Sequence, residues 1–545
     1  MTWVYLPFIC CPIKYQTIQF MAASEAIIAA LQKIFPKDQI DLSGESLTLN
    51  QSDVFFTAIS PPVAIVFPTA FTQIQDLIKS AGEVGYSIAP KGAGLSYSDG
   101  YIPNNQHTVI VDMCMLNSII EINERDRYVT VQPGVTWEQL HDALVKTGLR
   151  TPFWGTFSGK YATIGGAVSQ GAKFFGSGNH GSVAESVLSL AVVIGDGSLV
   201  TTGSAATPHN PSPFYRYYGP DLTGLFLGDC GAYGIKTEIT LQLIPAPQCI
   251  NTASFSFHSA ADMIAAMTEI GAQKLASECF ALDPFLVNLR MKFEGLSEDL
   301  ESLQKVFTSQ HSLVAGLTEL ASMALHGRRF IKSVGFLMSV VTEGSDISEA
   351  NSTMAKVSLI VKRHAGSEVP NSLPKVIRAS PFRKINRLLG PEGERIVWFH
   401  AMVPNSRALD LYIETEKVFD LHASEIETFN LRYGYLISVN GPSTFGLEPI
   451  IYFKGQALPI HTRYIDHSHF EKLPKYPHSA DALQAVLKIR EAIIRKWADL
   501  GATHLQIGRT YPYLSTRTEG SRSVLSSIKS MFDPHGLFNP GVLEK

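Results

Sequence analysis

Two stretches of the sequence gather side chains that can move a proton or hold an anion. VWFHAMVP places His400 among apolar and aromatic residues, and ATHLQIGRTYPY gathers His504, Arg509 and Tyr511. Histidine is the most common general base near neutral pH, and arginine binds a carboxylate through two parallel hydrogen bonds. We therefore expect His400 or His504 as a proton acceptor and Arg509 as a carboxylate clamp. The alternatives are a hydrogen-bonded core histidine and a surface loop in which Arg509 only covers apolar surface.

A third stretch, HTRYIDHSHF, brings His461, Asp466, His467 and His469 together. A His-x-His pair binds a metal ion when both rings face the same side, as alternate residues of a strand do. The competing interpretation is a solvated loop. We favour the loop and expect no metal site.

Three glycine-bearing loops form a separate signal. PKGAGLS (90–96) follows an apolar strand, VQPGVTW (131–137) leads into a helix, and TIGGAVSQGA (163–172) is a Gly-Gly turn into another helix. Glycines let main-chain N–H groups turn inward around an anion, and a helix N-terminus favours negative charge. Each loop alone is compatible with an ordinary turn. Together, in this order and spacing, they predict one shared ligand.

A literal GxGxxG pattern at residues 176–181 raises a different possibility, a nicotinamide-dependent reductase. Such a site needs a buried strand directly before the glycines, a helix directly after them and an acidic residue about 20 positions on. The preceding AVSQGAKFF lacks the pattern of a buried strand, and Asp196 stands beside Gly197 in a predicted hairpin turn. We therefore rank this alternative low.

The elements predicted between residues 60 and 250 place these loops at the ends of strands and helices. Strands at 61–68 and 86–90 flank an amphipathic helix at 72–85, which is the pattern of a βαβ unit. We expect a small mixed sheet, a helix with Thr136 as its N-cap, a hairpin turning at Asp196-Gly197 and a final strand. Their ranges are 108–113, 118–123 and 128–134 for the sheet, 136–148 for the helix, 190–203 for the hairpin and 235–245 for the strand.

The composition excludes several classes of protein. With 545 residues the chain is long enough for two or three domains. Its 45 basic against 49 acidic residues give a net charge of −4, which disfavours a nucleic-acid partner. Its 30 Phe and 19 Tyr supply ample apolar surface for a folded core.

Termini and cysteines indicate the compartment. Residues 1–20 are apolar but lack the basic start of a secretory signal, so we interpret them as an extension. No stretch reaches the ~20 apolar residues of a membrane span, and we expect no transmembrane segment. The 6 cysteines have neither disulfide-framework nor zinc-ligand spacing, which favours a reducing compartment, and we expect a cytoplasmic protein.

The glycine loops and their neighbours resemble one known family. The matching stretches are IAPKGAGLSYSDG, YVTVQPGVTWEQL, TIGGAVSQGAKFFGSGNHGSVAESVLSLAVVIGDGSLVTTG and GPDLTGLFLGDCGAYGIKTEITLQL, with SIKSMFDPHGLFNPGVL near the C-terminus. They resemble the FAD-binding domain of the vanillyl-alcohol oxidase/p-cresol methylhydroxylase (PCMH) family, which includes D-lactate and glycolate dehydrogenase-like flavoproteins. The resemblance covers most of residues 60–248, extends more weakly to the C-terminal segment and is faint between them. The His-x-Gly-Asp-Gly-Asn-x-His segment of the metal-bearing members is absent.

The resemblance implies that each loop contacts a different part of FAD. The pyrophosphate loop falls on Lys91, Gly92, Ala93, Gly94, Leu95 and Ser96, while Pro133 and Gly134 lie near the adenosine end or the pyrophosphate. Thr163, Gly165 and Gly166 line the ribityl chain and flavin, His180, Gly181 and Ser182 approach the isoalloxazine, and Gly234 and Ile235 contact adenine or flavin through the main chain. Members with a histidyl-linked flavin carry histidine where this sequence has Leu95. A covalent bond from this loop is therefore excluded, and we expect non-covalent FAD.

The resemblance also implies a reaction. We expect an FAD-dependent oxidoreductase that oxidises a hydroxyl-bearing carbon of a small-molecule substrate by hydride transfer to flavin N5. The stretch around His504 is similar to a His-Gly-Ile-Gly segment of the 2-hydroxy-acid members, which with Arg509 favours a D-lactate-like or glycolate-like acid. A phenolic or aromatic alcohol is the alternative, in which Tyr511 and Tyr513 hold a phenolate. Oxygen, a quinone and a cytochrome are all compatible electron acceptors, and a homodimer is a compatible assembly.

The expected fold class is α+β, a two-domain PCMH-type FAD-binding fold with an inserted α+β substrate (cap) domain. We expect an N-terminal extension and helix at 1–55 and the FAD-binding domain at 56–248. The cap domain follows at 249–505, and a C-terminal segment at 506–545 returns to the FAD-binding domain.

Overall fold

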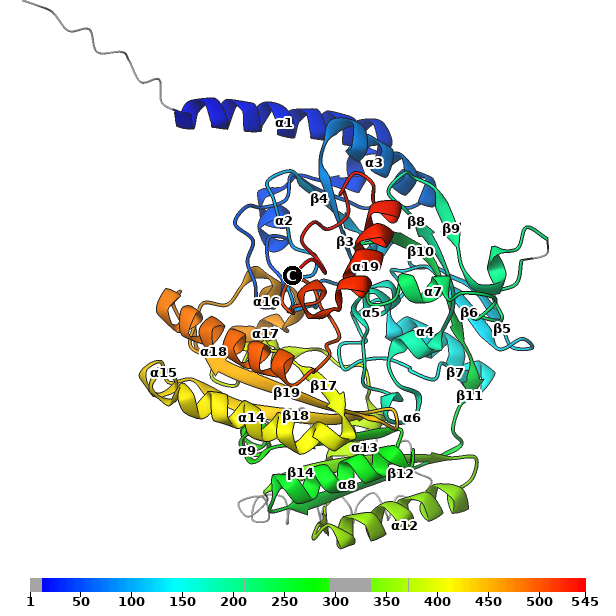
Figure 1. Cartoon of the computed structure of the whole chain (residues 1–545), viewed down its shortest axis with the longest axis vertical. Coiled ribbons are helices and arrows are strands. Elements are labelled where there is room, and N and C mark those ends of the chain that lie inside the picture. The colour runs from blue at the N-terminus through cyan, green and yellow to red at the C-terminus, as the bar shows by residue number, and fades with distance from the viewer. Residues whose placement is uncertain (1–11, 210, 294–334, 371) are drawn as a thin grey trace, which may run out of the picture.

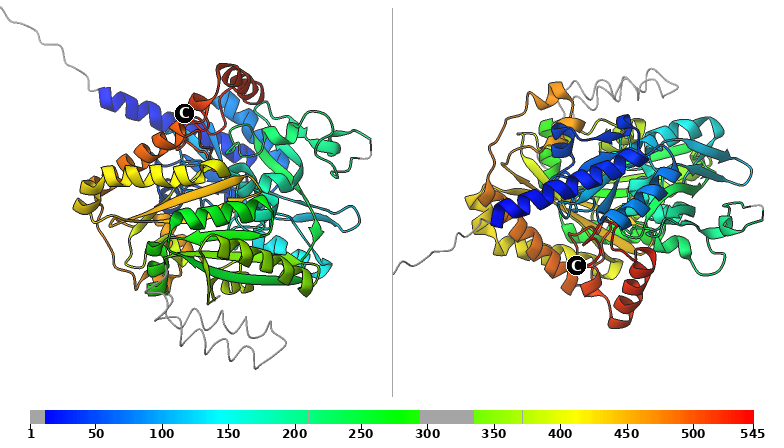
Figure 2. Two further views of the ribbon diagram at one scale, coloured as in Figure 1. Left: turned by 60° about the horizontal axis from the view of Figure 1, so that its bottom comes forward. Right: turned by 90° about the horizontal axis from the view of Figure 1, so that it is seen from above.

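The computed structural model describes residues 12–209, 211–293, 335–370 and 372–545. Within them the first half of the chain forms a four-stranded and a five-stranded sheet, and the second half forms an eight-stranded sheet, here called the cap sheet. Figure 1 shows the cap sheet, green to orange, below the two smaller sheets, and Figure 2 gives two further directions. Cys10 and Cys11 lie outside the described residues, and the four described cysteines are free.

The four-stranded sheet has the order β1–β2–β4–β3. Strands β2 and β3 both run parallel to β4, which lies between them, whereas β1 is antiparallel to β2. Helix α3 (Phe71–Val84) links β2 to β3 and ends at Gly85, whose φ of +85° is left-handed. The predicted βαβ unit is present, with β4 inserted between its two strands. The strand bounds are β1 Ile40–Asp41, β2 Ala64–Val66, β3 Ser87–Lys91 and β4 Thr108–Asp112.

The five-stranded sheet is antiparallel, in the order β5–β6–β10–β8–β9. The prediction that 108–113 shares a sheet with 118–123 and 128–134 is wrong. Strand β4 is buried along its whole length and lies inside the parallel sheet, whereas β5 is half exposed and stays at an edge. The hairpin at Asp196-Gly197 is confirmed. The bounds are β5 Ile119–Asn123, β6 Tyr128–Val131, β8 Val187–Val193, β9 Leu199–Thr201 and β10 Ile235–Gln242; β7 Leu149–Arg150 pairs separately with β11 Ile244–Pro245.

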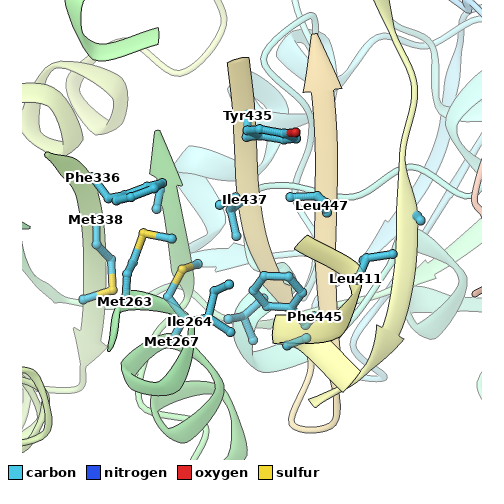
Figure 3. Packing of buried hydrophobic residues seen from close by; sticks show 14 of the residues in the cluster. Met263, Ile264, Met267, Phe336, Met338, Leu411, Tyr435, Ile437, Phe445 and Leu447 are labelled. Carbon is cyan, nitrogen blue, oxygen red and sulfur yellow. The ribbon is translucent and has the colours of Figure 1, made fainter. Parts of the chain in front are cut away.

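The cap sheet has the order β15–β12–β14–β13–β18–β19–β16, and β17 also pairs with β19. Helices α8 (Ala260–Ala272), α12 (Ile347–Arg363), α14 (Ala408–Leu421) and α18 (Ala480–Asp499) cover one of its faces. Figure 3 shows part of this core, where side chains of α8 and α14 lie against those of β18 and β19. The bounds are β12 Cys249–Phe257, β13 Glu278–Leu282, β14 Phe336–Gly344, β15 Ser367–Val369, β16 Arg395–Trp398, β17 Ala401–Pro404, β18 Arg432–Asn440 and β19 Thr444–Phe453.

The opposite face of the cap sheet is turned toward the first half of the chain. Along β19, Leu447 and Ile451 enter the helix-covered core, whereas Ile450 and Tyr452 join a second core with Trp137 of α4 and residues of the five-stranded sheet. This alternation follows from the period of two in a strand. Side chains on the second face therefore lie at the interface between the two halves.

Charged side chains fasten the interface, and the chain end returns to the first sheet. Arg378 donates to Glu278 at 3.1 Å and to Glu343 at 2.6 Å, and Arg150 of β7 also donates to Glu343. Ile88 of β3 donates its N–H to the carbonyl oxygen of Leu537 at 2.8 Å, so residues after α19 (Glu519–Phe532) extend the four-stranded sheet.

The remaining helices are shorter, apart from α1, and none of those in the described residues has both the length and the apolarity of a membrane span. Their bounds are α1 Pro12–Ile34, α2 Gly44–Leu49, α4 Trp137–Leu144, α5 Ile164–Gln170, α6 Ser177–His180, α7 Leu222–Leu225, α9 Pro284–Phe293, α13 Ser372–Ala379, α15 Ala423–Thr428, α16 Pro459–Tyr464 and α17 His467–Phe470.

Candidate active site

A large cavity lies among the predicted glycine loops. It comprises about 980 Å³ of empty space, including solvent at its mouth. The loops that follow β3, precede α4 and lead into α5 all reach it. The predicted residues on its wall are Lys91, Gly92, Ala93, Gly94, Leu95, Ser96, Pro133, Thr163, Gly165, Gly166, Gly234 and Ile235.

Glycine is required where these loops meet. A Cβ on Gly92 would lie 2.3 Å from Thr163 Oγ1, and a Cβ on Gly165 would lie 2.5 Å from Pro133 Cβ. Gly94 has a φ of +75°, a conformation that strains other residues. The close packing of the loops therefore excludes larger residues at these three positions.

The cavity wall offers main-chain hydrogen-bond donors and little free positive charge. Among the described residues, the N–H groups of residues 92–96 donate no hydrogen bond to the protein. The two lysines on the wall are both paired: Lys91 Nζ lies 2.8 Å from Asp112, and Lys236 Nζ lies 2.6 Å from Asp229. Unpaired amide groups on a glycine-rich loop form an anion-binding concavity. These features fit the diphosphate of a dinucleotide cofactor.

Four predicted cofactor residues are not on the cavity wall. Gly134 lies behind it, where a Cβ would be 2.4 Å from the carbonyl oxygen of Met113. His180, Gly181 and Ser182 lie at the end of α6, which packs against the cap sheet. Their predicted approach to the isoalloxazine stays a prediction.

The GxGxxG segment has the wrong surroundings for a nicotinamide site. It follows the loop after α5 rather than a strand, and its helix α6 has only 4 residues. Asp196, the acidic residue at the tempting distance, accepts the N–H of Ser198 in the hairpin turn. The nicotinamide alternative is therefore wrong for this segment.

The structure brings His400, His504 and Tyr511 together, but not at the cavity. The rings of His504 and Tyr511 stack with centroids 4.0 Å apart. His400 accepts the N–H of Leu505 on Nε2 at 2.9 Å, and His504 Nδ1 lies 2.8 Å from the carbonyl oxygen of His400. These hydrogen bonds fix the turn before Gln506, a residue of the cavity wall. The contacts indicate positioning of this turn and disfavour the predicted role of a general base.

Burial keeps both histidines neutral. It lowers the pKa of His400 well below its ordinary value, and it lowers that of His504 to about 4. It also raises the pKa of Tyr511, so the phenol stays protonated and donates or accepts only as a neutral group. A protonated phenol can still donate a hydrogen bond to a substrate phenolate, so the predicted role of Tyr511 in the phenolic alternative stays a prediction.

Arg509 has contacts that differ from the predicted carboxylate clamp. Its guanidinium donates to Asp99 Oδ1 at 2.8 Å, to the carbonyl oxygen of Pro540 at 2.9 Å and to Asn539 Oδ1 at 3.1 Å. Asp99 follows the glycine-bearing loop of residues 91–96, and the other two residues belong to the chain end. Arg509 therefore ties the C-terminal segment to that loop, because its donors already have protein partners.

A group of polar side chains lies at the interface between the two halves of the chain, and the sequence analysis did not predict it. We call Tyr97, Lys173, Ser438, Glu448 and Gln506 the interface polar cluster. Lys173 Nζ donates to Ser438 Oγ at 2.9 Å, Tyr97 Oη donates to Glu448 Oε1 at 3.3 Å, and Gln506 Nε2 donates to Tyr97 Oη at 3.4 Å. Gln506 lies on the cavity wall, as does Ala172, the neighbour of Lys173. The cluster therefore borders the cavity on its cap side.

The cluster holds two opposite charges that are not in contact. No carboxylate oxygen within the described parts of the chain lies within 4.0 Å of Lys173 Nζ. Burial lowers the pKa of Lys173, and Glu448 partly restores it; burial likewise raises the pKa of Glu448, and Lys173 opposes that shift. Each side chain keeps some exposed surface.

The histidines of 461–470 do not form a metal site. His461 accepts the N–H of Leu458 on Nδ1 at 2.9 Å, and Asp466 pairs with Lys384 at 2.6 Å. His467 and His469 lie on α17, where residues two apart do not face the same side. Across the described ranges, no group of 3 or more histidine, cysteine or acidic side chains is arranged to hold a metal ion.

Comparison with known proteins connects the cavity to a cofactor. Residues 62–203 match the model of the family described as FAD binding domain. The chain is similar to a probable mitochondrial D-lactate dehydrogenase of Danio rerio, with 27% identity over 54% of this chain and 57% of that protein. It is also similar to glycolate oxidase subunit GlcD of Bacillus subtilis, with 31% identity over 35% of this chain and 39% of that protein. The matches thus span little more than half of these relatives, or less.

Among solved structures, the chain is similar to p-cresol methylhydroxylase with substrate bound. The TM-score is 0.71 at 16% identity, and the superposition covers 95% of this chain and 96% of that one. The fold is therefore that of a two-domain, FAD-binding α+β protein, as the sequence predicts. The protein binds FAD through the domain of residues 62–203, and its fold along most of the chain is similar to that of p-cresol methylhydroxylase.

Proposed function

We propose that the protein is an FAD-dependent oxidoreductase that oxidises the hydroxyl-bearing carbon of a 2-hydroxy acid to a keto group. The observation that carries this proposal is Lys173, an ammonium group at the cap side of the cofactor cavity that no described carboxylate neutralises within 4.0 Å. A half-buried ammonium group without a carboxylate in direct contact favours an anionic ligand, because an ion pair offsets part of the cost of burying the charge. The names of two relatives, D-lactate dehydrogenase and glycolate oxidase, refer to 2-hydroxy acids and support the same class.

The chain supplies binding and orientation for this reaction. When bound, FAD provides a two-electron acceptor at flavin N5. Lys173 would hold the substrate carboxylate by a charge-assisted hydrogen bond. Phe174, Trp398 and Leu436 are half-buried apolar side chains on both sides of the interface, and they would keep water away from the reacting carbon.

Anaerobic mixing of the FAD-loaded protein with candidate substrates tests this proposal. The probes are D-lactate, glycolate and D-2-hydroxy acids with larger substituents, compared with 4-alkylphenols. We expect a 2-hydroxy acid to bleach the visible flavin absorbance, with keto acid formed in an amount equal to the flavin reduced. Bleaching by 4-alkylphenols alone would replace the acid by the phenolic alternative. No bleaching by either class would overturn the proposal.

We also propose that FAD is held without a covalent bond. Leu95 stands in the loop where other members carry a histidyl link, and its hydrocarbon side chain cannot form one. Cys230 is a thiol on the cavity wall, but burial raises its pKa to about 12, so little reactive thiolate is present. Acid precipitation should release yellow FAD into the supernatant, and flavin that stays with the precipitated protein would contradict this proposal.

A further inference from the structure

Glu448 lies on the face of the cap sheet that is turned toward the FAD-binding half. Phe445 and Leu447 enter the helix-covered core, so the alternating residues Gly446, Glu448 and Ile450 point the other way. Gly446 leaves room for the ammonium group of Lys173, because a Cβ there would lie 2.7 Å from Lys173 Nζ. The carboxylate of Glu448 and the ammonium group of Lys173 therefore lie on the same face of β19.

The carboxylate of Glu448 accepts a hydrogen bond from Tyr97 and can accept further hydrogen bonds. Tyr97 donates to Oε1 at 3.3 Å, and Gln506 of the cavity wall donates in turn to Tyr97. Within the described residues, no lysine, arginine or histidine nitrogen lies within 4.0 Å of this carboxylate. A carboxylate accepts several hydrogen bonds, so Glu448 retains acceptor capacity for a hydroxyl group of a ligand.

None of the described titratable groups that face Glu448 is a competing general base. They are Lys173 from the loop after α5, Tyr97 from the loop after β3 and Tyr511 from the C-terminal segment. Burial raises the pKa of both tyrosines, so their phenols stay protonated. In His400 and His504 one ring nitrogen each is engaged by a main-chain group, and neither residue lies on the cavity wall.

We infer that Glu448 is the general base of the reaction, an inference that rests on the proposed oxidation of a 2-hydroxy acid. Its carboxylate takes the proton of the substrate hydroxyl. The hydrogen of the C–H bond on the same carbon would leave with both electrons as a hydride, for which FAD, when bound, would supply the acceptor. The substrate becomes a 2-keto acid, the flavin is reduced by two electrons, and the proton on Glu448 passes to water. Carboxylate and hydroxyl lie on adjacent carbons of the substrate, so Lys173 and Glu448 can engage both at once.

The direct test replaces Glu448 by glutamine, which keeps the shape and removes the base. General acid–base catalysis contributes typically 10²–10⁴-fold, so we expect the anaerobic rate of flavin reduction in Glu448→Gln to fall by about that factor. Bound FAD and the affinity for a 2-hydroxy-2-methyl acid should change little, because this analogue has no hydrogen to transfer. Binding of the analogue is followed by the change in the flavin spectrum.

A matched control separates the base from a structural carboxylate. Glu416 of α14 also accepts from a tyrosine, Tyr435, but on the helix-covered face of the sheet. Glu416→Gln should reduce its flavin at the wild-type rate, and Glu448→Asp should retain part of the activity that Glu448→Gln loses.

The outcomes distinguish this inference from the proposed function. Wild-type reduction by a 2-hydroxy acid, together with an unchanged rate in Glu448→Gln, would overturn the base and leave the function standing. An unchanged pH dependence in Glu448→Gln would overturn it as well, because the base must lose its proton before it acts. Absence of reduction in the wild type by any 2-hydroxy acid would overturn both.

Discussion

The cofactor cavity and the interface polar cluster are neighbours that are built in different ways. The cavity wall comes from short stretches of sequence whose main chain faces inward, and its lysines are paired with aspartates. The cluster comes from side chains of distant segments, and its lysine has no such partner among the described residues. We infer that cofactor binding depends on main-chain geometry, whereas the proposed chemistry depends on a few side chains. Mutations should therefore separate the two.

Removal of the ammonium group of Lys173 should have the largest effect on substrate affinity. A hydrogen bond to a charged group contributes about 1.5–3 kcal/mol, so Lys173→Met should lower the affinity for a 2-hydroxy acid by about 10- to 150-fold. FAD content should stay at the wild-type level. Lys173→Arg keeps the charge and should recover part of the affinity. Substrate titrations of anaerobic flavin reduction measure the change, and an affinity within twofold of wild type in Lys173→Met would count against the carboxylate site.

A single methyl group added to the cavity wall should weaken the binding of FAD, which the change at Lys173 should leave unaltered. In Gly165→Ala the new Cβ would lie 2.5 Å from Pro133 Cβ, and overpacking of this kind costs about 1–3 kcal/mol. The loops must separate, so we expect FAD to bind roughly 5- to 150-fold more weakly. Reconstitution of apoprotein with FAD measures this. Gly520→Ala is the control, because a Cβ there meets nothing within 4 Å. Equal FAD affinity in the wild type and both variants would contradict the assignment of the glycine loops as the FAD site.

The loops could be predicted from the sequence because each carries its signal within a few residues. Glycines at 90–96 and 163–172 are required by close contacts and a left-handed φ, and these constraints act on neighbouring positions. The N-cap at Thr136 is local in the same way, and the structure confirms it, with Thr136 Oγ1 accepting the N–H of Gln139 at 3.2 Å. Local requirements of this kind leave a readable pattern.

The cluster could not be predicted because its members are far apart in the chain. Glu448 and Tyr97 are separated by 351 positions, and no local sequence pattern predicts that they are in contact. Lys173 and Tyr97 do stand next to glycine loops, so attention to polar residues flanking those loops would have found both. His400 and His504 illustrate the converse: their type predicts a base, but their ring nitrogens are engaged by main-chain groups that the sequence does not reveal.

The pH dependence should reflect the two charges of the cluster. Burial raises the pKa of Glu448, and the base acts as a carboxylate, so the rate of flavin reduction should fall as the pH is lowered through that pKa. Burial lowers the pKa of Lys173, and the anchor acts as an ammonium group, so substrate affinity should fall as the pH is raised through it. Each limb has a slope of up to about tenfold per pH unit. The acidic limb should vanish in Glu448→Gln, and its persistence would assign it to another group.

Removal of a predicted base should have the smallest effect on chemistry. His504→Ala loses a hydrogen bond and a stacked ring, which should lower the free energy of unfolding by about 1 kcal/mol. The rate of flavin reduction should stay within a few-fold of wild type. Because the folded pKa of about 4 lies below the unfolded value, wild-type stability should fall as the pH drops from about 6.5 toward 4, and the variant should lose less over this range. Thermal unfolding at several pH values measures this, whereas loss of flavin reduction with stability intact would restore His504 as a catalytic residue.

The most direct test of the division between cavity and cluster is anaerobic flavin reduction by a D-2-hydroxy acid in the variant Lys173→Met/Glu448→Gln. We predict that this protein carries FAD as the wild type does and that its visible flavin absorbance is not bleached when wild-type absorbance is. Bleaching at the wild-type rate by the same acid would show that the chemistry lies elsewhere and would contradict the account.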